Sequence, residues 1–187
     1  MLKALISPFM LVIAGILVYA NSLSNPFIYD DQVAIVDNVD IRQLWPPSWV
    51  SPTTLEHAPT NSRPVVSFTL ALNYAFGTLD VRGFRAFNIA VHILCSFAIY
   101  LVLNQTFSNA EGRALTVALL WLVHPLNSQC IQYVIQRSES LMALCYLLTL
   151  YYSARYMQTG NARLSLAAVS YCALGMASKE VMVTEPN

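Results

Sequence analysis

The chain has 187 residues, of which 56% are hydrophobic and 11% are charged. Soluble proteins carry roughly 25% charged residues, so this composition excludes an ordinary soluble domain. The formal net charge of zero also argues against nucleic acid as a partner.

We therefore expect an all-α integral membrane protein that forms a single membrane domain over residues 1–187. The first predicted span covers residues 4–23, an apolar run that follows Lys3. A cleaved signal peptide is the alternative, because a basic residue precedes the run and the letters VYA before Asn21 resemble a cleavage site. The run is long for the apolar core of a signal peptide, so we expect an uncleaved transmembrane helix.

Residues 24–83 form the first loop, which we expect to carry one or two amphipathic surface helices. The stretch SRPVVSFTLALNYAFG predicts a helix that begins near Pro64, because proline is tolerated in a first helical turn. Its apolar residues recur at helical spacing: Val65, Phe68, Leu72, Ala75 and Phe76. The stretch is too short and too polar to span comfortably, so we expect a helix on the membrane surface. A helix packed in a soluble core would show the same periodicity.

Four further apolar segments bring the expected count to about five transmembrane helices; they cover residues 84–103, 114–126, 141–157 and 164–177. The third and fifth spans are short against the roughly twenty residues that cross a bilayer, so each is expected to extend into its polar flank.

Inside the second span, Asn88 and His92 share a helical face. We expect His92 to bond a neighbouring helix; a ligand or proton-relay role is the alternative.

The short loops predict the orientation of the chain. With the N-terminus inside, the inner side holds one acid, Glu111, beside the basic residues Lys3, Arg113, Arg155 and Arg163. An excess of Lys and Arg in short loops marks the cytoplasmic side. The first loop is therefore expected on the outer side.

This topology brings three polar segments to the outer face: YDDQ at 29–32, HPLNSQCIQYVIQRSE at 124–139 and SKE at 178–180. Polar groups near hydrocarbon are costly unless they are paired, so their convergence predicts a functional site. The alternative is that the charged side chains of the last two segments pair with one another and extend to the interface at helix ends.

The four cysteines lack the spacing of a zinc site or a disulfide framework, and we expect neither.

Five motifs occur in a defined order: NPFIYDDQ, SRPVVSFTLALNY, FRAFNIAVHIL, HPLNSQCIQYVIQRSESLMALCYLLTLYY and GMASKEVMVTEP. Together they resemble the N-terminal membrane region of bacterial tetratricopeptide-repeat membrane proteins, which are similar to eukaryotic transmembrane O-mannosyltransferases with tetratricopeptide repeats. The resemblance extends from about Asn21 to Pro186. It implies a C-type glycosyltransferase fold in a bacterial inner membrane, with a cytoplasmic N-terminus and a periplasmic first loop.

Enzymes of this kind take a sugar from a polyprenyl-phosphate carrier and transfer it to an acceptor hydroxyl on the outer face. The resemblance implies that Asp30 or Asp31 is the catalytic general base, since a hydroxyl nucleophile must lose its proton to a nearby group. Arg137 and Lys179 would bind the donor phosphate, because cations stabilise phosphate charge as it develops. The supporting polar residues would be Arg63, His124, Glu139 and Glu180. The resemblance implies no metal and no other cofactor, with membrane lipid and polyprenyl-phosphate sugar as partners.

Two departures from the resemblance matter. Ser128 and Gln129 follow HPL where relatives often carry a Thr-Glu pair, so a carboxylate is missing there. The sequence ends at Asn187 and contains no helical repeat of about 34 residues, whereas relatives continue into further spans and a repeat array. We therefore expect a truncated N-terminal part of a glycosyltransferase. The alternative is a non-catalytic accessory subunit packed against other membrane subunits of a larger complex.

Overall fold

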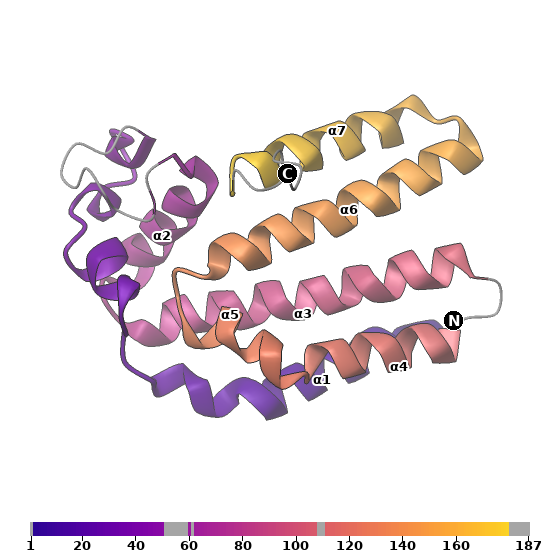
Figure 1. The fold of residues 1–187 in the computed structure, drawn as a ribbon, viewed down its shortest axis with the longest axis horizontal. Coiled ribbons are helices and arrows are strands. Elements are labelled where there is room, and N and C mark those ends of the chain that lie inside the picture. The colour runs from indigo at the N-terminus through magenta and orange to yellow at the C-terminus, as the bar shows by residue number, and fades with distance from the viewer. Residues whose placement is uncertain (1, 51–59, 61, 108–110, 180–187) are drawn as a thin grey trace, which may run out of the picture.

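The protein is represented by a computed structural model that describes residues 2–50, 60, 62–107 and 111–179. In this described part, every regular element is a helix, which confirms the all-α fold class. Long helices lie side by side (Figure 1), namely α1 (Leu2–Tyr19), α3 (Val81–Thr106), α4 (Glu111–Leu122), α6 (Arg137–Thr159) and α7 (Ala162–Met176). Helix α2 (Pro64–Gly77) lies with the short helices of the first loop at one end of this layer, which we call the loop end.

Local sequence explains where the long helices start and stop. The Asp80 carboxylate accepts a hydrogen bond from the Arg82 backbone N–H at 3.0 Å and caps α3. Gly160, at φ 67°, ends α6 in the left-handed conformation that glycine adopts without strain. Asn161 then caps α7 by accepting from the Arg163 backbone N–H at 3.1 Å. Helix α2 begins at Pro64, as the sequence predicts.

The third predicted span, residues 114–126, is not one continuous helix. Helix α4 ends at Leu122, and the chain bends by 55° into η5 (Pro125–Ser128) and α5 (Gln129–Gln132). Pro125 accounts for this break, because proline disfavours the helical conformation of the residue before it. His124 is accordingly extended, at φ −66° and ψ 128°.

Helices occupy all five predicted span positions, but the expected count of about five membrane spans is not confirmed. Within the described residues, two stretches are long and apolar enough to cross a membrane, Ser7–Ser24 and Val81–Thr106, and the bent pair from Glu111 to Gln132 makes up to three. Helix α7 has 15 residues and is therefore about 22 Å long, against roughly 30 Å of hydrocarbon. Helix α6 has 23 residues, but its tyrosines and polar residues make it too polar to count among the candidate spans.

The predicted apolar stripe of α2 faces outward rather than into the protein. Phe68 is 43% exposed and Phe76 is 85% exposed. The opposite face packs inward through Val66 and Leu70, which are fully buried against the first loop. The aromatic residues of this stripe therefore lie at the surface of the described part of the chain, and its membrane-surface placement stays a prediction.

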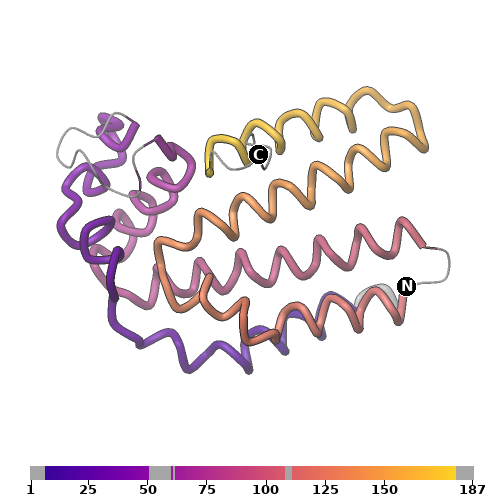
Figure 2. Tube along the Cα trace, viewed as in Figure 1, coloured from indigo at the N-terminus to yellow at the C-terminus, as the bar shows by residue number. Residues whose placement is uncertain are grey.

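Three buried clusters join the described elements, and the two larger ones lie along the layer and at the loop end. The first cluster joins α1, α3 and α4 through Leu11, Tyr100, Ala118 and Leu122. Figure 2 traces the course of these helices. Gly15 lets α1 approach α3, since a Cβ there would lie 2.5 Å from Ile93 Cγ1. A second cluster at the loop end joins the first loop, α2 and the turn before α6, through Ala34, Ile35, Ile41, Val66, Leu70, Ala71, Phe84, Val134 and Ile135.

Candidate functional site

A polar cavity of about 280 Å³ lies where the first loop and the start of α6 meet the segment that follows α7. Four of the predicted site residues line it: Asp30, Arg63, Glu139 and Lys179. Gln136 and Ser138 add neutral hydrogen-bonding groups. The tertiary structure thus brings together charged residues from three separate segments, two of each sign.

The two adjacent carboxylates separate. Asp30 is exposed and lines the cavity, whereas Asp31 has no exposed surface. The preceding residue, Tyr29, has φ 50°, an uncommon conformation for an aromatic residue. Its ring stacks on Tyr133 with the ring centroids 5.6 Å apart. This turn directs the first carboxylate outward and the second into the protein.

The Asp31 carboxylate fastens the first loop to the turn before α6. Its Oδ1 accepts from the Ile135 backbone N–H at 2.8 Å, and its Oδ2 accepts from the Val134 backbone N–H at 3.2 Å. The N–H of Ile28 also donates to Oδ2, at 3.4 Å. Charge-assisted bonds to backbone donors are among the stronger hydrogen bonds in proteins. Asp31 therefore stabilises the polypeptide that carries Asp30.

Arg137, a predicted phosphate ligand, is fully buried and does not line the cavity. Its Nε donates to Asn88 Oδ1 at 3.0 Å, and its Nη1 donates to Asn73 Oδ1 at 2.8 Å and Thr69 Oγ1 at 3.3 Å. Its Nη2 donates to the Phe84 carbonyl at 3.1 Å. These bonds tie α6 to α2 and α3.

Burial lowers the pKa of Arg137 to about 9, and the Asp31 carboxylate acts in the opposite direction. The guanidinium therefore stays protonated at neutral pH. It lies 4.5 Å from the ring centroid of Phe87, so a cation–π contact adds to its hydrogen bonds. In this position the hydrogen bonds and the cation–π contact of Arg137 join three helices.

Sequence reasoning gave no role to Arg85, which is also fully buried. Its guanidinium donates to four backbone carbonyls: those of Asn25 at 2.8 Å, Pro26 at 2.6 Å, Ile131 at 3.2 Å and Gln132 at 2.8 Å. Arg85 thereby joins the start of the first loop to α5. The spacing Arg85, Asn88, His92 on one helical face of an apolar span was the pattern that could have identified it.

Lys179 donates to Glu139 Oε1 across the cavity, and the two side chains are 19% and 34% exposed. This ion pair confirms part of the alternative in which the charged groups at helix ends pair with one another. The pair leaves Lys179 at the surface of the cavity, where its ammonium is within reach of a ligand. An incoming anion would compete with Glu139 for it.

Two supporting residues do not join the cavity in the described part of the chain. His124 is exposed at the α4–η5 bend, where its Nδ1 accepts from the Leu126 backbone N–H at 3.3 Å. Glu180 lies outside the described residues. Over the residues that are described, no three His, Cys, Asp or Glu side chains form a group that could hold a metal ion.

His92 forms the helix–helix hydrogen bond that the sequence predicts. Its Nε2 lies 3.0 Å from the Leu122 carbonyl, and the Tyr19 hydroxyl donates to the same carbonyl at 2.7 Å. A carbonyl accepts only, so Nε2 carries the proton. The bend after α4 deprives the Leu122 carbonyl of a helical partner, and side chains from α1 and α3 supply two.

Comparisons with known proteins identify the family of the chain. Residues 57–185 match the family described as dolichyl-phosphate-mannose-protein mannosyltransferase. The chain is 31% identical over 143 residues to protein O-mannosyl-transferase TMTC1 of Homo sapiens. This match covers 72% of this chain and 16% of the relative. It is also 29% identical over 168 residues to protein O-mannosyl-transferase TMTC4 of Mus musculus, and this match covers 79% of this chain and 23% of the relative.

A third relative, protein O-mannosyl-transferase Tmtc1 of Drosophila melanogaster, is 24% identical over 173 residues, covering 89% of this chain and 20% of the relative. The chain thus spans between 16% and 23% of the length of these three proteins. No solved structure matches it. With more than half of its residues in the family match and the first of these relatives above 30% identity, the chain belongs to the dolichyl-phosphate-mannose-protein mannosyltransferase family.

Proposed function

We propose that this chain forms part of a membrane glycosyltransferase that moves a sugar from a polyprenyl-phosphate carrier to an acceptor hydroxyl on the outer membrane face. One observation carries the proposal: Asp30 and Lys179, 149 positions apart in the chain numbering, line one polar cavity with Arg63. Such a reaction needs a base for the acceptor and a cation for the departing phosphate. The family match supports the transfer of a hexose of the mannosyl type.

The proposed reaction uses the cavity residues as follows. The acceptor oxygen attacks the anomeric carbon while the bond from that carbon to the phosphate oxygen breaks. The acceptor proton passes to the Asp30 carboxylate, which is exposed and able to receive it. The leaving polyprenyl phosphate gains negative charge, which Lys179 and Arg63 stabilise. Asp31 and Arg137 act behind the cavity by holding its backbone and helices.

The orientation that fits this reaction places the N-terminus in the cytoplasm and the first loop in the periplasm of a bacterial inner membrane. The excess of basic residues at the ends of the helices remote from the loop end supports this orientation. A polyprenyl-phosphate donor would then approach the loop end through the bilayer. The exposed apolar side chains Leu166 and Val169 of α7, at 69% and 63%, are the kind of surface that lipid covers.

A transfer assay in native membranes tests the proposal, with polyprenyl-phosphate mannose as donor and a Ser/Thr-containing peptide as acceptor. Asp30→Asn should lower kcat by at least a hundredfold, because loss of a general base typically costs this much. Lys179→Met should raise KM for the donor and lower kcat. Arg155→Met, on the exposed far part of α6, is the matched control and should leave both constants unchanged. Unaltered turnover in Asp30→Asn contradicts the assignment.

A non-catalytic role as an accessory subunit is the second candidate. It is favoured by the internal bonds of Asp31, Arg137 and the Glu139–Lys179 pair, since these groups all serve the fold as it stands. This function predicts no turnover by the wild-type protein in its native membranes. It also predicts recovery of the chain with larger membrane subunits after mild detergent extraction. Turnover that depends on Asp30 would rule it out.

A further inference from the structure

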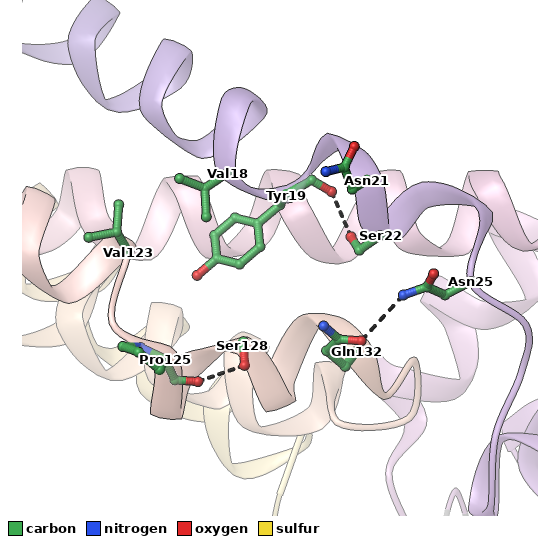
Figure 3. Close-up of a pocket in the computed structure, with 9 residues that line it drawn as sticks. All are labelled: Val18, Tyr19, Asn21, Ser22, Asn25, Val123, Pro125, Ser128 and Gln132. Atoms are coloured by element: carbon green, nitrogen blue, oxygen red, sulfur yellow. Dashed lines mark hydrogen bonds between the residues drawn. The ribbon is translucent and has the colours of Figure 1, made fainter.

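A second and larger cavity, of about 430 Å³, lies between the end of α1 and the bend that follows α4 (Figure 3). It is separate from the polar cavity of Asp30, because the two share no lining residue. The volume falls within the range of roughly 300–1,000 Å³ that small-molecule sites occupy. No part of the proposed transfer reaction uses it.

The chemistry of this cavity is neutral and rich in hydrogen-bonding groups. None of the nine described residues that line it carries a charge, whereas the Asp30 cavity has four charged residues. Amides come from Asn21, Asn25 and Gln132, and a hydroxyl comes from Ser128. A ligand with a phosphate or a carboxylate finds no cation here. A ligand with several hydroxyl groups finds both donors and acceptors.

The side chains that line the cavity keep hydrogen-bonding capacity for a ligand. Gln132 accepts from Asn25 Nδ2 through its Oε1 at 3.4 Å, and its amide nitrogen is turned away from Asn25 (Figure 3). Ser128 donates to the Pro125 carbonyl at 2.6 Å, which leaves the lone pairs of its hydroxyl to accept. Tyr19 also lines the cavity, with its ring extending toward Val123 and buried among neighbouring side chains.

The rim of the cavity is apolar on the side of the membrane span. Val18 and Val123 line it and are 47% and 40% exposed. Beside them, Leu17 is 74% exposed and Leu126 is 79% exposed. Ser7–Ser24 is one of the candidate spans by length and composition, so in a membrane this rim would continue into a surface that faces hydrocarbon. The cavity therefore joins a neutral polar interior to an apolar exterior, which is the pattern of an amphiphile with an uncharged headgroup.

We propose that this cavity binds an uncharged hexosyl group, either as the headgroup of a neutral glycolipid or as a free glycoside. A pyranose ring presents hydroxyl groups to the amides and Ser128, and its apolar face to the exposed side chains of Val18 and Val123 at the rim. In the lipid-borne form, the tail lies along α1 past Val18. This site is independent of the transfer reaction, and it stands whether or not the Asp30 cavity is catalytic.

Native mass spectrometry of the full chain tests the proposal, with monoglucosyl diacylglycerol as probe and phosphatidylcholine and phosphatidylglycerol of equal chain length as competitors. The glucosyl lipid should bind at least tenfold more tightly than either phospholipid. Saturation-transfer NMR with methyl β-D-glucoside forms the second arm and reports whether the free sugar suffices. Binding in either arm supports the site and identifies the source of the sugar; binding in neither arm overturns it.

Two substitutions connect binding to this cavity. Gln132→Leu and Asn21→Leu should each weaken binding by about threefold to tenfold, the usual effect of one lost hydrogen bond. Asn21 is exposed, so its substitution keeps the test valid if Gln132→Leu lowers folding. Gln129→Leu is the matched control, because Gln129 is exposed on the same short helix and does not line the cavity. Equal losses in Gln129→Leu, or equal affinity for phosphatidylglycerol, would refute the site.

Discussion

Asp30 and Asp31 are consecutive residues whose carboxylates enter different surroundings. The Asp31 carboxylate is fully buried and accepts from the backbone N–H groups of Val134 and Ile135, while Asp30 faces a polar cavity. Because Asp31 holds the turn in place, Asp30 is left with a defined position at the cavity wall. The pair therefore divides into a residue for structure and a residue available for chemistry.

Asp31→Asn should lower the free energy of unfolding by about 2–3 kcal/mol, since hydrogen bonds to a charged group are worth about 1.5–3 kcal/mol. The asparagine side chain would also place its NH₂ group against a backbone N–H, where the carboxylate has an accepting oxygen. Asp30→Asn, at an exposed position, should change the free energy by less than about 0.5 kcal/mol. Thermal unfolding in mild detergent, followed by circular dichroism, measures both. Equal destabilisation by the two substitutions would contradict this division.

Arg137→Met should destabilise the protein by about 3 kcal/mol, because it leaves buried acceptors on Asn88, Asn73 and Phe84 without their donor. Arg137→Lys should recover less than half of this loss, since one ammonium cannot reach all of these acceptors. Arg155→Met on the same helix is exposed and should have almost no effect. Unfolding monitored by tryptophan fluorescence separates the three variants. Full recovery by lysine would show that charge alone matters.

Arg85→Lys should loosen the connection between the first loop and α5. The guanidinium bonds carbonyls of both segments, and the smaller ammonium of lysine cannot span them. We expect a loss of about 2 kcal/mol in unfolding free energy and faster amide hydrogen exchange at residues 25–32 and 131–135. Arg82→Lys, exposed three residues earlier, is the control. If exchange in these segments stays at the wild-type rate, Arg85 does not couple them.

Tyr19 and His92 should be energetically coupled through the Leu122 carbonyl that both contact. Tyr19→Phe or His92→Phe alone leaves this carbonyl one partner and should cost about 1 kcal/mol. The double variant leaves it with neither side chain, so its cost should exceed the sum of the single costs by at least about 0.5 kcal/mol. A double-mutant cycle of thermal unfolding measures this difference, and additive costs would exclude the coupling.

Glu139→Gln should affect transfer kinetics more than stability. Its ion pair with Lys179 is partly exposed, and such pairs contribute about 1 kcal/mol or less. In the proposed transfer reaction, removing the carboxylate frees Lys179 for the donor phosphate, so we expect a lower KM for polyprenyl-phosphate mannose. The same assay with Glu111→Gln, a distant exposed acid, controls for net charge. A higher KM in Glu139→Gln would mean that the carboxylate itself helps to bind the donor.

Periodicity and composition were enough to predict the helices. The apolar runs and the proline of α2 determine local structure over a few turns, so Pro64 begins a helix as predicted. The same local rules predicted that His92 would bond a neighbouring helix. The expected count of about five spans is not confirmed, because α7 is short for a bilayer and α6 is more polar than the candidate spans.

The tertiary structure alone decided which charged residues face a cavity. Asp30 and Asp31 are indistinguishable by sequence, and only the turn at Tyr29 separates their directions. Arg137 and Lys179 are both cations near helix ends, yet one is enclosed by α2 and α3 and the other stays at the surface. Sequence determines which side chains an element carries, because helix formation depends on neighbours along the chain. Burial and pairing depend on contacts between distant segments, and those contacts exist only in the folded protein.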